Sequence, residues 1–267
     1  MSRNFIHFGT LSTPSRVLII GASGELGSAL AKHYAESGAA LSLWGRNAAR
    51  LEIVAETCRT AGAASIATRS LDLIDVQAAV AAVALEDDTA PFTVAVIASG
   101  LGDIRAEECL FEDPALVARL GTVNFVAPAA IAAELAARMA MHKRGAIVLI
   151  GSAAAFHALP FAAAYAGSKA GLARFADALR IAMRPHGVSV TLVSPGFIDT
   201  AAARAVPGPK PLAMSPAHAA GKIARATAQG KGHLVMPWPF ALLRIIDRTL
   251  PRPLRDRLLR ALTPPGR

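Results

Sequence analysis

Cysteine is nearly absent from this sequence, and its histidines are scattered. The two cysteines, Cys58 and Cys109, stand far apart, with no Cys-x-x-Cys pair and no histidine at ligand spacing nearby. The seven histidines also lack the spacing of metal ligands. The sequence therefore indicates neither a disulfide framework nor a zinc site, and we expect no bound metal.

Aromatic residues are scarce as well, at 5% of the chain, with two tyrosines and two tryptophans. The formal net charge is +9, and a basic excess is one mark of nucleic-acid binding. Proteins that bind nucleic acids usually add aromatic platforms or a recognisable reading helix, and neither is found here. We therefore expect no nucleic-acid partner.

Long apolar runs and a leader-like start are also missing. No apolar run reaches the ~18 to 20 residues that a membrane-spanning helix needs. Residues 1–16 lack the basic start, the apolar stretch and the small-residue cleavage site of a signal peptide. We expect a cytoplasmic protein, and 267 residues are enough for one large α/β domain.

The positive charge is concentrated at the C-terminal end. Residues 231–267 hold eight Lys or Arg against two Asp, which is +6 of the total of +9. Two amphipathic pieces, from Leu242 to Leu250 and from Leu254 to Leu262, place arginines opposite leucines and isoleucines. This pattern fits a helix packed on the domain or on another subunit. It fits a helix lying on an anionic membrane surface equally well, with Trp238 beside it.

Short aliphatic runs alternate with longer Ala-rich stretches, a pattern typical of βαβ units and a parallel sheet. The aliphatic runs are continuous, as expected of strands covered on both faces. A doubly wound α/β sheet of about seven strands is predicted. The expected strands are 16–20, 40–44, 65–71, 93–98, 145–150, 188–193 and 233–236. The expected helices are about 25–37, 47–61, 75–85, 114–142, 163–184 and 215–228, with stops at Gly38, Gly62 and Gly187.

A glycine-rich turn follows the first expected strand directly. It contains Gly21, Ser23, Gly24, Leu26 and Gly27, and a helix is expected next. Glycines remove the Cβ atoms that would hold a backbone away from a pyrophosphate, and a helix start offers free N–H groups. An ordinary tight connection can have the same composition. The position after the first strand favours a dinucleotide cofactor.

The end of the second expected strand bears on which dinucleotide binds. NAD sites usually present a carboxylate here to the ribose hydroxyls, whereas the 2′-phosphate of NADP calls for an arginine. Gly45 supplies no carboxylate, and Arg46 supplies a guanidinium. NADP(H) is therefore expected in preference to NAD(H), unless Arg46 is simply a solvated surface arginine.

Tyr165 and Lys169 are four residues apart in an expected helix, so their side chains leave the same face. An ammonium ~4 Å from the phenol, at an effective dielectric near ~20, would favour the phenolate by ~4 kcal/mol. We therefore expect Tyr165 to titrate near neutrality and to exchange a proton with a carbonyl or alcohol oxygen. Chance also supplies such pairs, so the surroundings matter: Ser152 follows a strand, and Asn124 lies in an earlier helix.

With these residues in order, the sequence resembles the short-chain dehydrogenase/reductase family, in its short single-domain branch, from about Arg16 to Met236. The resemblance rests on the glycine turn, on residues 165–169 (Tyr-Ala-Gly-Ser-Lys) and on residues 195–200 (Pro-Gly-Phe-Ile-Asp-Thr). It implies a Rossmann-type fold and a homodimer or homotetramer. The chain is then divided into an N-terminal extension (1–15), a catalytic domain (16–236) and a basic tail (237–267).

The resemblance also implies roles for individual residues. Tyr165 would be the acid/base, Ser152 would hydrogen-bond the substrate oxygen, Lys169 would hold the nicotinamide ribose and tune Tyr165, and Asn124 would help a proton relay through water. Asp72 and its neighbour would meet the adenine, and residues 195–200 the nicotinamide and pyrophosphate. The expected cofactor-binding residues are Gly21, Ser23, Gly24, Leu26, Gly27, Arg46, Asp72, Leu73, Ser99, Gly100, Tyr165, Lys169, Pro195, Gly196, Ile198 and Thr200.

Two places depart from the family pattern. Glu25 stands where the short branch has its middle glycine, and the spacing Gly21, Gly24, Gly27 is that of longer relatives, which include sugar-nucleotide epimerases. Residues 97–100 read Ile-Ala-Ser-Gly where Asn-Asn-Ala-Gly is usual. This second change removes amide hydrogen bonds thought to brace the central sheet.

The expected substrate pocket is apolar. Phe156, Leu159, Phe161, Phe197 and the loop 201–214 follow the catalytic strands, which favours a lipophilic carbonyl or secondary alcohol. We therefore expect an NADPH-dependent oxidoreductase that interconverts a ketone or aldehyde and an alcohol. The alternatives are an epimerase or reductase of the extended branch, and a non-catalytic dinucleotide-binding scaffold at a membrane.

Overall fold

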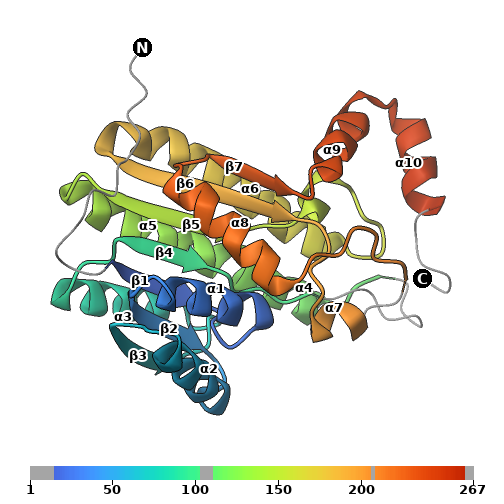
Figure 1. Ribbon diagram of the computed structural model, residues 1–267. Helices are drawn as coiled ribbons and strands as arrows, with labels where there is room; N and C mark the ends of the chain where they lie inside the picture. Colours follow the sequence, from blue (N-terminus) through green and yellow to red (C-terminus); the bar gives the residue numbers. More distant parts are fainter. Residues whose placement is uncertain (1–14, 103–110, 206–207, 262–267) are drawn as a thin grey trace.

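Seven parallel strands form the central sheet, as predicted (Figure 1). The computed structural model describes residues 15–102, 111–205 and 208–261. The strands are β1 (Arg16–Ile20), β2 (Ala40–Gly45), β3 (Ser65–Ser70), β4 (Val94–Ile97), β5 (Gly145–Ile150), β6 (Val188–Pro195) and β7 (His233–Met236). Their order across the sheet is β3-β2-β1-β4-β5-β6-β7.

The direction of winding reverses at β1, which lies between β2 and β4. In sheets wound in both directions, a crevice opens at this point outside the carboxyl ends of the strands. The residues that follow β1, β2, β4 and β5 therefore meet along one edge, which we call the carboxyl edge. The fold brings the glycine turn and Ser152 to this edge.

Helices cover both faces of the sheet. They are α1 (Glu25–Ala35), α2 (Ala48–Thr60), α3 (Val76–Thr89), α4 (Pro114–Gly121), α5 (Ala127–Met141), α6 (Ala163–Met183), α7 (Ala201–Ala205), α8 (Pro216–Ala228), α9 (Pro239–Thr249) and α10 (Arg252–Ala261). Residues of α1, α2 and α8 build the core on one face, and residues of α3, α5 and α6 build it on the other.

Strand β1 shows why its sequence is apolar at every position from Val17 to Ile20. Val17 and Ile19 are buried in the core under α1, α2 and α8, whereas Leu18 and Ile20 are buried in the core on the other face. Side chains alternate between the two faces of a strand, so a strand covered on both sides needs an apolar residue everywhere. The prediction from the continuous runs is confirmed for β1, β4 and β5, whereas β3 at the edge of the sheet is largely exposed.

Most expected elements are found within a few residues of their predicted bounds, and the helix stops at Gly38, Gly62 and Gly187 are confirmed, with φ of +74°, +104° and +73°. The helix expected over 114–142 is instead divided. A π-helical turn (Thr122–Val126) separates α4 from α5. A π turn inserts extra backbone into a helix, which periodicity in the sequence does not reveal.

The run Pro114–Met141 is long and apolar enough to cross a membrane by length and composition, with a mean hydropathy of 1.5. The expectation that no such run exists was wrong. Ile131, Leu135 and Met139 in this run are nonetheless almost fully buried in the core of the folded domain. The same composition is therefore explained by packing against the sheet.

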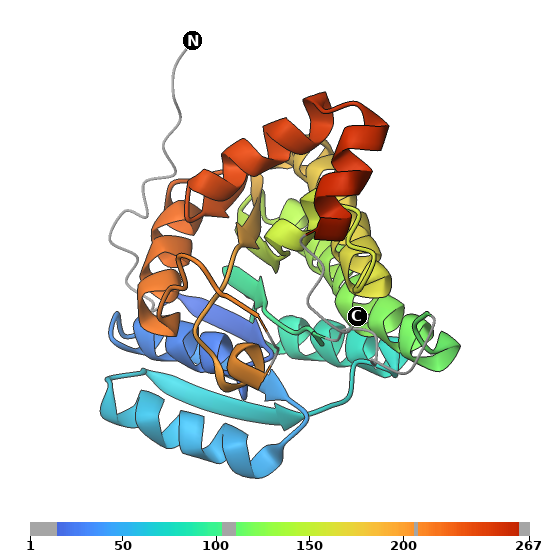
Figure 2. The same ribbon diagram turned by 90° about the vertical axis from the view of Figure 1, so that its right-hand side faces the viewer.

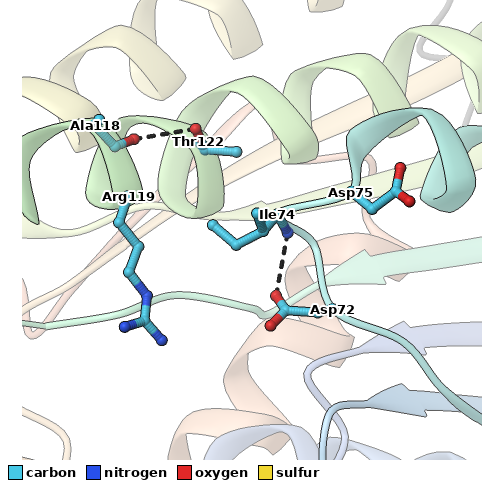
Figure 3. A pocket seen from close by; sticks show the side chains of 6 residues that line it. All are labelled: Asp72, Ile74, Asp75, Ala118, Arg119 and Thr122. Atoms are coloured by element: carbon cyan, nitrogen blue, oxygen red, sulfur yellow. Dashed lines mark hydrogen bonds between the residues drawn. The ribbon is translucent and has the colours of Figure 1, made fainter. Parts of the chain in front are cut away.

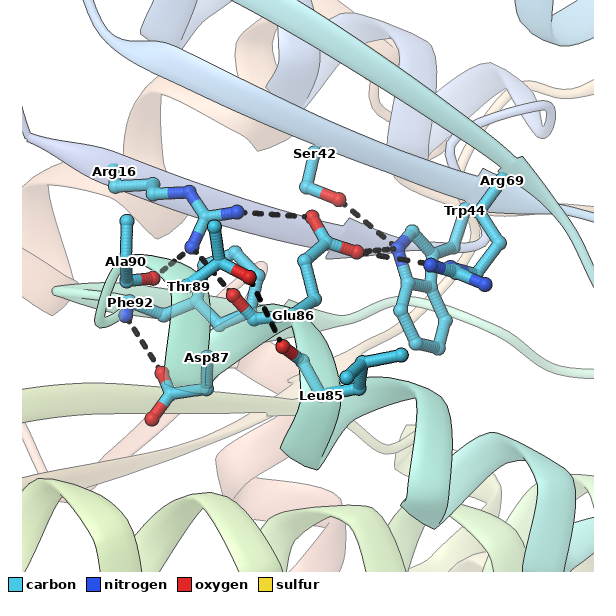
Figure 4. A network of polar contacts seen from close by, with 10 residues as sticks. All are labelled: Arg16, Ser42, Trp44, Arg69, Leu85, Glu86, Asp87, Thr89, Ala90 and Phe92. Atoms are coloured by element: carbon cyan, nitrogen blue, oxygen red, sulfur yellow. Dashed lines mark hydrogen bonds and ion pairs between the residues drawn. The ribbon is translucent and has the colours of Figure 1, made fainter.

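A partly buried polar network fixes the end of β2 (Figure 4). Glu86 of α3 pairs with Arg16 at 3.2 Å and accepts a hydrogen bond from Trp44 Nε1 at 3.2 Å. Arg69 of β3 lies 5.2 Å above the Trp44 ring. One carboxylate thus joins three neighbouring strands and holds Trp44 just before the residues that are expected to meet the cofactor.

The tail forms two helices, α9 and α10, beyond β7 at the carboxyl edge (Figures 1 and 2). Several predictions lie outside the described residues: the extension up to residue 14, Cys109, residues 206 and 207 of the substrate loop, and the tail after residue 261.

Candidate active site

The glycine turn places backbone where side chains do not fit. Gly21 has φ +91°, and a Cβ there would lie 2.7 Å from the amide nitrogen of Ser99. A Cβ on Gly27 would lie 2.2 Å from the Gly21 carbonyl oxygen. Glycine at both positions lets the start of α1 approach the end of β1 closely. This cradle fits a pyrophosphate held by backbone N–H groups.

Glu25, the departure in this turn, makes a specific contact. Its Oε1 accepts a hydrogen bond at 2.6 Å from the amide nitrogen of Ala201, the first residue of α7. The carboxylate therefore ties the glycine turn to the start of the loop 201–214. Sequence reasoning missed this contact because the two residues are 176 positions apart.

The end of β2 lies against the glycine turn. A Cβ on Gly45 would lie 2.6 Å from Ser23 Oγ, so a larger residue there would displace Ser23. Arg46, the next residue, is exposed. Where NAD sites typically have a carboxylate, this chain has a glycine closely approached by the Ser23 hydroxyl and followed by an exposed guanidinium.

The segment after β4 adjoins both the turn and the catalytic helix. Ser99 Oγ is buried and has no hydrogen-bond partner among the described residues. A buried hydroxyl without a partner is costly, and a ligand hydroxyl would satisfy it. Together with the glycine cradle, this orphaned group fits a dinucleotide. Glycine at position 100 leaves room for the Lys169 side chain, because a Cβ there would lie 3.1 Å from Lys169 Nζ.

Asn124 lies fully buried in the π turn. Its side-chain oxygen accepts from the Leu101 amide at 2.8 Å, and its Nδ2 donates to the Leu101 carbonyl at 2.9 Å and to Ser168 Oγ at 3.2 Å. Ser168 Oγ in turn donates to the Tyr165 carbonyl at 2.8 Å. Asn124 therefore braces both the segment after β4 and the helix that carries Tyr165.

Ser152, Tyr165 and Lys169 meet where β5 ends. Ser152 Oγ accepts from the Ala154 amide at 3.1 Å, which caps a short 3₁₀ helix (Ala153–Phe156), and its hydroxyl is close enough to the Tyr165 side chain to lower the pKa of that phenol. Lys169 is buried, and its Nζ donates to the Ile150 carbonyl at 3.0 Å. The arrangement can present two hydroxyl groups to one substrate oxygen.

A model of the short chain dehydrogenase family matches residues 15–210 of this chain. An uncharacterized oxidoreductase of Mycobacterium tuberculosis is 34% identical over 239 residues, which cover 88% of this chain and 94% of that protein. The chain belongs to the short-chain dehydrogenase family. It is thus an NAD(P)-dependent oxidoreductase, as the resemblance predicted.

Other short-chain dehydrogenases show the same breadth of similarity. Dehydrogenase/reductase SDR family member 7B of Bos taurus is 30% identical and covers 91% of this chain and 79% of its own. The solved structure of a bulky-bulky ketone specific alcohol dehydrogenase from Comamonas testosteroni has a TM-score of 0.75 at 21% identity, with 95% and 96% of the chains covered. An actinorhodin polyketide ketoreductase with NADPH has a TM-score of 0.75 at 21% identity, with 84% and 95% covered.

The pKa of Tyr165 differs from the expectation in this short-chain dehydrogenase. Burial raises the pKa of Tyr165 above its usual value, and the Ser152 hydroxyl acts in the opposite direction. Burial also lowers the pKa of Lys169 to about 8. The expectation that Lys169 brings Tyr165 to neutrality was wrong for the protein alone, because it counted one Coulomb pair and ignored desolvation.

The adenine end of the expected cofactor site lies after β3. Asp72 Oδ1 accepts from the Ile74 amide at 3.1 Å (Figure 3). The Leu73 side chain is buried in the core, which leaves its backbone to meet a ligand. An open, shallow pocket adjoins this segment, and its lining residues are Asp72, Ile74, Asp75, Ala118, Arg119 and Thr122.

The segment after β6 reaches from the sheet to α7. Pro195 ends the strand, and the Gly196 amide donates to the Met236 carbonyl at 2.8 Å. Ile198 forms an isolated bridge with Met214, which closes the loop 201–214 at its base. Thr200 Oγ1 accepts from the Ala203 amide at 3.1 Å and so caps α7.

Two supporting residues were not anticipated from the sequence. Glu112 is buried, and its Oε2 accepts at 2.8 Å from the Ala164 amide at the start of α6. Phe240 of α9 packs so closely on Gly196 that a Cβ there would lie 2.5 Å from its ring. Neither contact follows a local spacing, so no sequence signal pointed to them.

Proposed function

We propose that this short-chain dehydrogenase is an NADPH-dependent reductase of an apolar ketone or aldehyde. In the reverse direction it oxidises the corresponding alcohol. The observation that carries the proposal is the placement of Ser152, just after β5, beside Tyr165, whose helix α6 also carries buried Lys169 with its Nζ on the Ile150 carbonyl. The raised pKa of Tyr165 keeps its hydroxyl protonated at neutral pH, as a proton donor requires.

Each residue of the centre has a distinct part in this proposal. A nicotinamide cofactor held in this site would supply the hydride for the carbonyl carbon. Ser152 donates a hydrogen bond to the carbonyl oxygen and orients it, and Tyr165 gives its hydroxyl proton to that oxygen. Lys169 would hold the nicotinamide ribose, and Asn124, which keeps the helix of Tyr165 in register through Ser168, would support a water-linked relay.

The sixteen cofactor-binding residues expected from the sequence remain our proposal for the NADPH site. Support comes from the cradle at Gly21 and Gly27, from the orphaned Ser99 hydroxyl and from the close approach of Ser23 to Gly45. The NADPH preference rests on exposed Arg46, whose guanidinium suits a 2′-phosphate.

We expect Arg46→Asp to weaken NADPH binding relative to NADH by about 10- to 100-fold, because a charge-assisted hydrogen bond is replaced by repulsion. Isothermal titration with both dinucleotides measures the change. Arg144→Asp, an exposed arginine beside the opposite end of β5, serves as the control with the same charge change. An unchanged ratio of the two affinities in Arg46→Asp would refute the preference for NADPH.

An apolar substrate is favoured by the aromatic rings around the site. Phe156 lies on the 3₁₀ helix after Ser152, and Phe197 and Phe240 stack edge to face with centroids 6.3 Å apart beside Gly196. Rings in these positions exclude water and favour a lipophilic group beside the carbonyl. The Comamonas enzyme, similar in fold, is named for bulky ketones.

The alternatives fit less well. An extended-branch epimerase is opposed by the segment 195–200, which follows the short branch, and a non-catalytic scaffold has no chemical need for Ser152, Tyr165 and Lys169 together. We also propose a homodimer or homotetramer, supported by exposed Val117, Val126 and Ile181 on α4, the π turn and α6. The proposed location is the cytoplasm, at the inner membrane surface when the tail is bound there.

The direct test incubates the protein with NADPH or NADH and a panel of ketones and aldehydes graded in size and polarity, and follows nicotinamide absorbance. We expect turnover with NADPH that increases with the apolar character of the substrate. Bound dinucleotide without turnover on any member would favour the scaffold. Turnover limited to polar sugars would favour the epimerase or reductase of the extended branch.

A further inference from the structure

Helix α9 of the tail packs on the domain through Phe240 and Arg244. Phe240 of α9 packs on Gly196 and Phe197, and Arg244 lies 5.3 Å above the Phe156 ring and 3.3 Å from His233 Nδ1. Helix α9 is therefore anchored to β7 and to the loops beside Ser152. Its orientation is set by these contacts, and the opposite stripe of the helix turns outward.

The outward side of the tail is apolar and unpartnered within the described residues. Trp238, Leu242, Ile245, Leu254 and Leu258 are between 46% and 70% exposed. Leu242 and Ile245 follow helical spacing on α9, with Trp238 just before the helix, and Leu254 and Leu258 follow it on α10. Soluble proteins rarely leave so many large apolar side chains together on two adjacent helices without a partner.

Exposed basic side chains accompany the apolar residues of α10. Arg252, Arg257 and Arg260 of α10 are exposed, and residues 231–267 contribute +6 to the net charge. Apolar side chains with a tryptophan, bordered by arginines, are complementary to an anionic lipid surface, where each arginine contributes by attraction to the headgroups. A second copy of this chain would present the same positive charge and would be repelled.

We propose that α9 and α10 dock this enzyme on an anionic lipid surface, with Trp238, Leu242, Ile245, Leu254 and Leu258 entering the interface. Figure 2 shows α9 and α10 at the carboxyl edge of the sheet, so a lipid surface bound to them would lie beside this edge. Substrates dissolved in the bilayer reach Ser152 and Tyr165 without crossing bulk water. Docking itself is independent of the proposed chemistry, so its test needs no substrate.

The test is co-sedimentation of the full chain with vesicles of phosphatidylcholine alone or with one-third phosphatidylglycerol. We expect binding to the anionic vesicles only, weakening as salt is raised. Leu242→Ser with Ile245→Ser should weaken binding at least ~10-fold. Arg257→Glu with Arg260→Glu should weaken it by more than ~10-fold, since each charge is worth about 5-fold.

Ile53→Ser on α2, an isoleucine of comparable exposure far from the tail, and Arg144→Glu are the matched controls and should leave binding unchanged. Circular dichroism and sedimentation velocity show whether each variant keeps its fold and its size. Absence of binding in the original chain, equal binding to neutral vesicles, or undiminished binding of the tail variants would overturn the proposal. A change of oligomeric size with no loss of vesicle binding would assign this face to a second copy.

Discussion

Tyr165→Phe is expected to lower carbonyl reduction by about 10³-fold, since a positioned general acid contributes that much to the rate. Phenylalanine keeps the ring and its packing and removes only the proton that the substrate oxygen needs. Steady-state kinetics with NADPH and the best substrate of the panel measure the loss. The affinity for NADPH, measured by titration calorimetry, should change by less than ~10-fold, because the dinucleotide is held mainly by other residues.

The second tyrosine of the chain supplies the control. Tyr34 lies on α1 and packs against the core beneath α1, α2 and α8, away from the carboxyl edge. Tyr34→Phe should leave turnover within ~2-fold. Retention of most activity in Tyr165→Phe would remove this residue from its role as proton donor, whereas an equal loss in both variants would indicate a general effect of removing a hydroxyl.

Lys169→Met should stabilise the fold while it abolishes turnover. Burial lowers the pKa of Lys169 from 10.5 to about 8, so keeping the ammonium in the folded protein at pH 7 costs about 3 kcal/mol. Methionine fills a similar volume without charge and leaves the Ile150 carbonyl without its donor, which costs about 1 kcal/mol. The net expectation is about 2 kcal/mol more stability at pH 7, measured by urea unfolding without cofactor.

The effect has a definite pH dependence. Between pH 8 and 10.5 the unfolded chain binds the Lys169 proton more strongly than the folded one, so this group makes the original protein more stable as pH rises. The advantage of Lys169→Met should therefore shrink between pH 7 and pH 10. Lys222→Met, an exposed lysine on α8, should show no such change. A constant advantage at both pH values would contradict the cost assigned to the buried ammonium.

Much of the fold and the site could be predicted because the relevant signals are local. The apolar runs of β1 and its neighbours indicate burial on both faces of the sheet. The spacing of Tyr165 and Lys169 indicates that the two side chains share one face of a helix. The glycines of the turn at Gly21 indicate that the backbone there can be approached closely by another group. Each of these depends on residues a few positions apart, so periodicity and spacing are sufficient to predict them.

The features that escaped prediction depend on tertiary packing. The contacts of Glu25 with Ala201 and of Glu112 with Ala164 join distant segments. The π turn that holds Asn124 changes the register of a helix whose composition continues unchanged. The pKa of Tyr165 was misjudged because burial, which is set by the whole fold, outweighs the nearby charge.

The packing of Phe240 on Gly196 has a consequence for the evolution of this chain. A Cβ at position 196 would lie 2.5 Å from the Phe240 ring. A residue larger than glycine at 196 is therefore incompatible with the present placement of Phe240. The two positions should therefore covary among related sequences, with glycine at 196 wherever an aromatic ring on α9 covers it. Loss of the tail would release this constraint, and acquisition of a tail helix of this kind would require the glycine first.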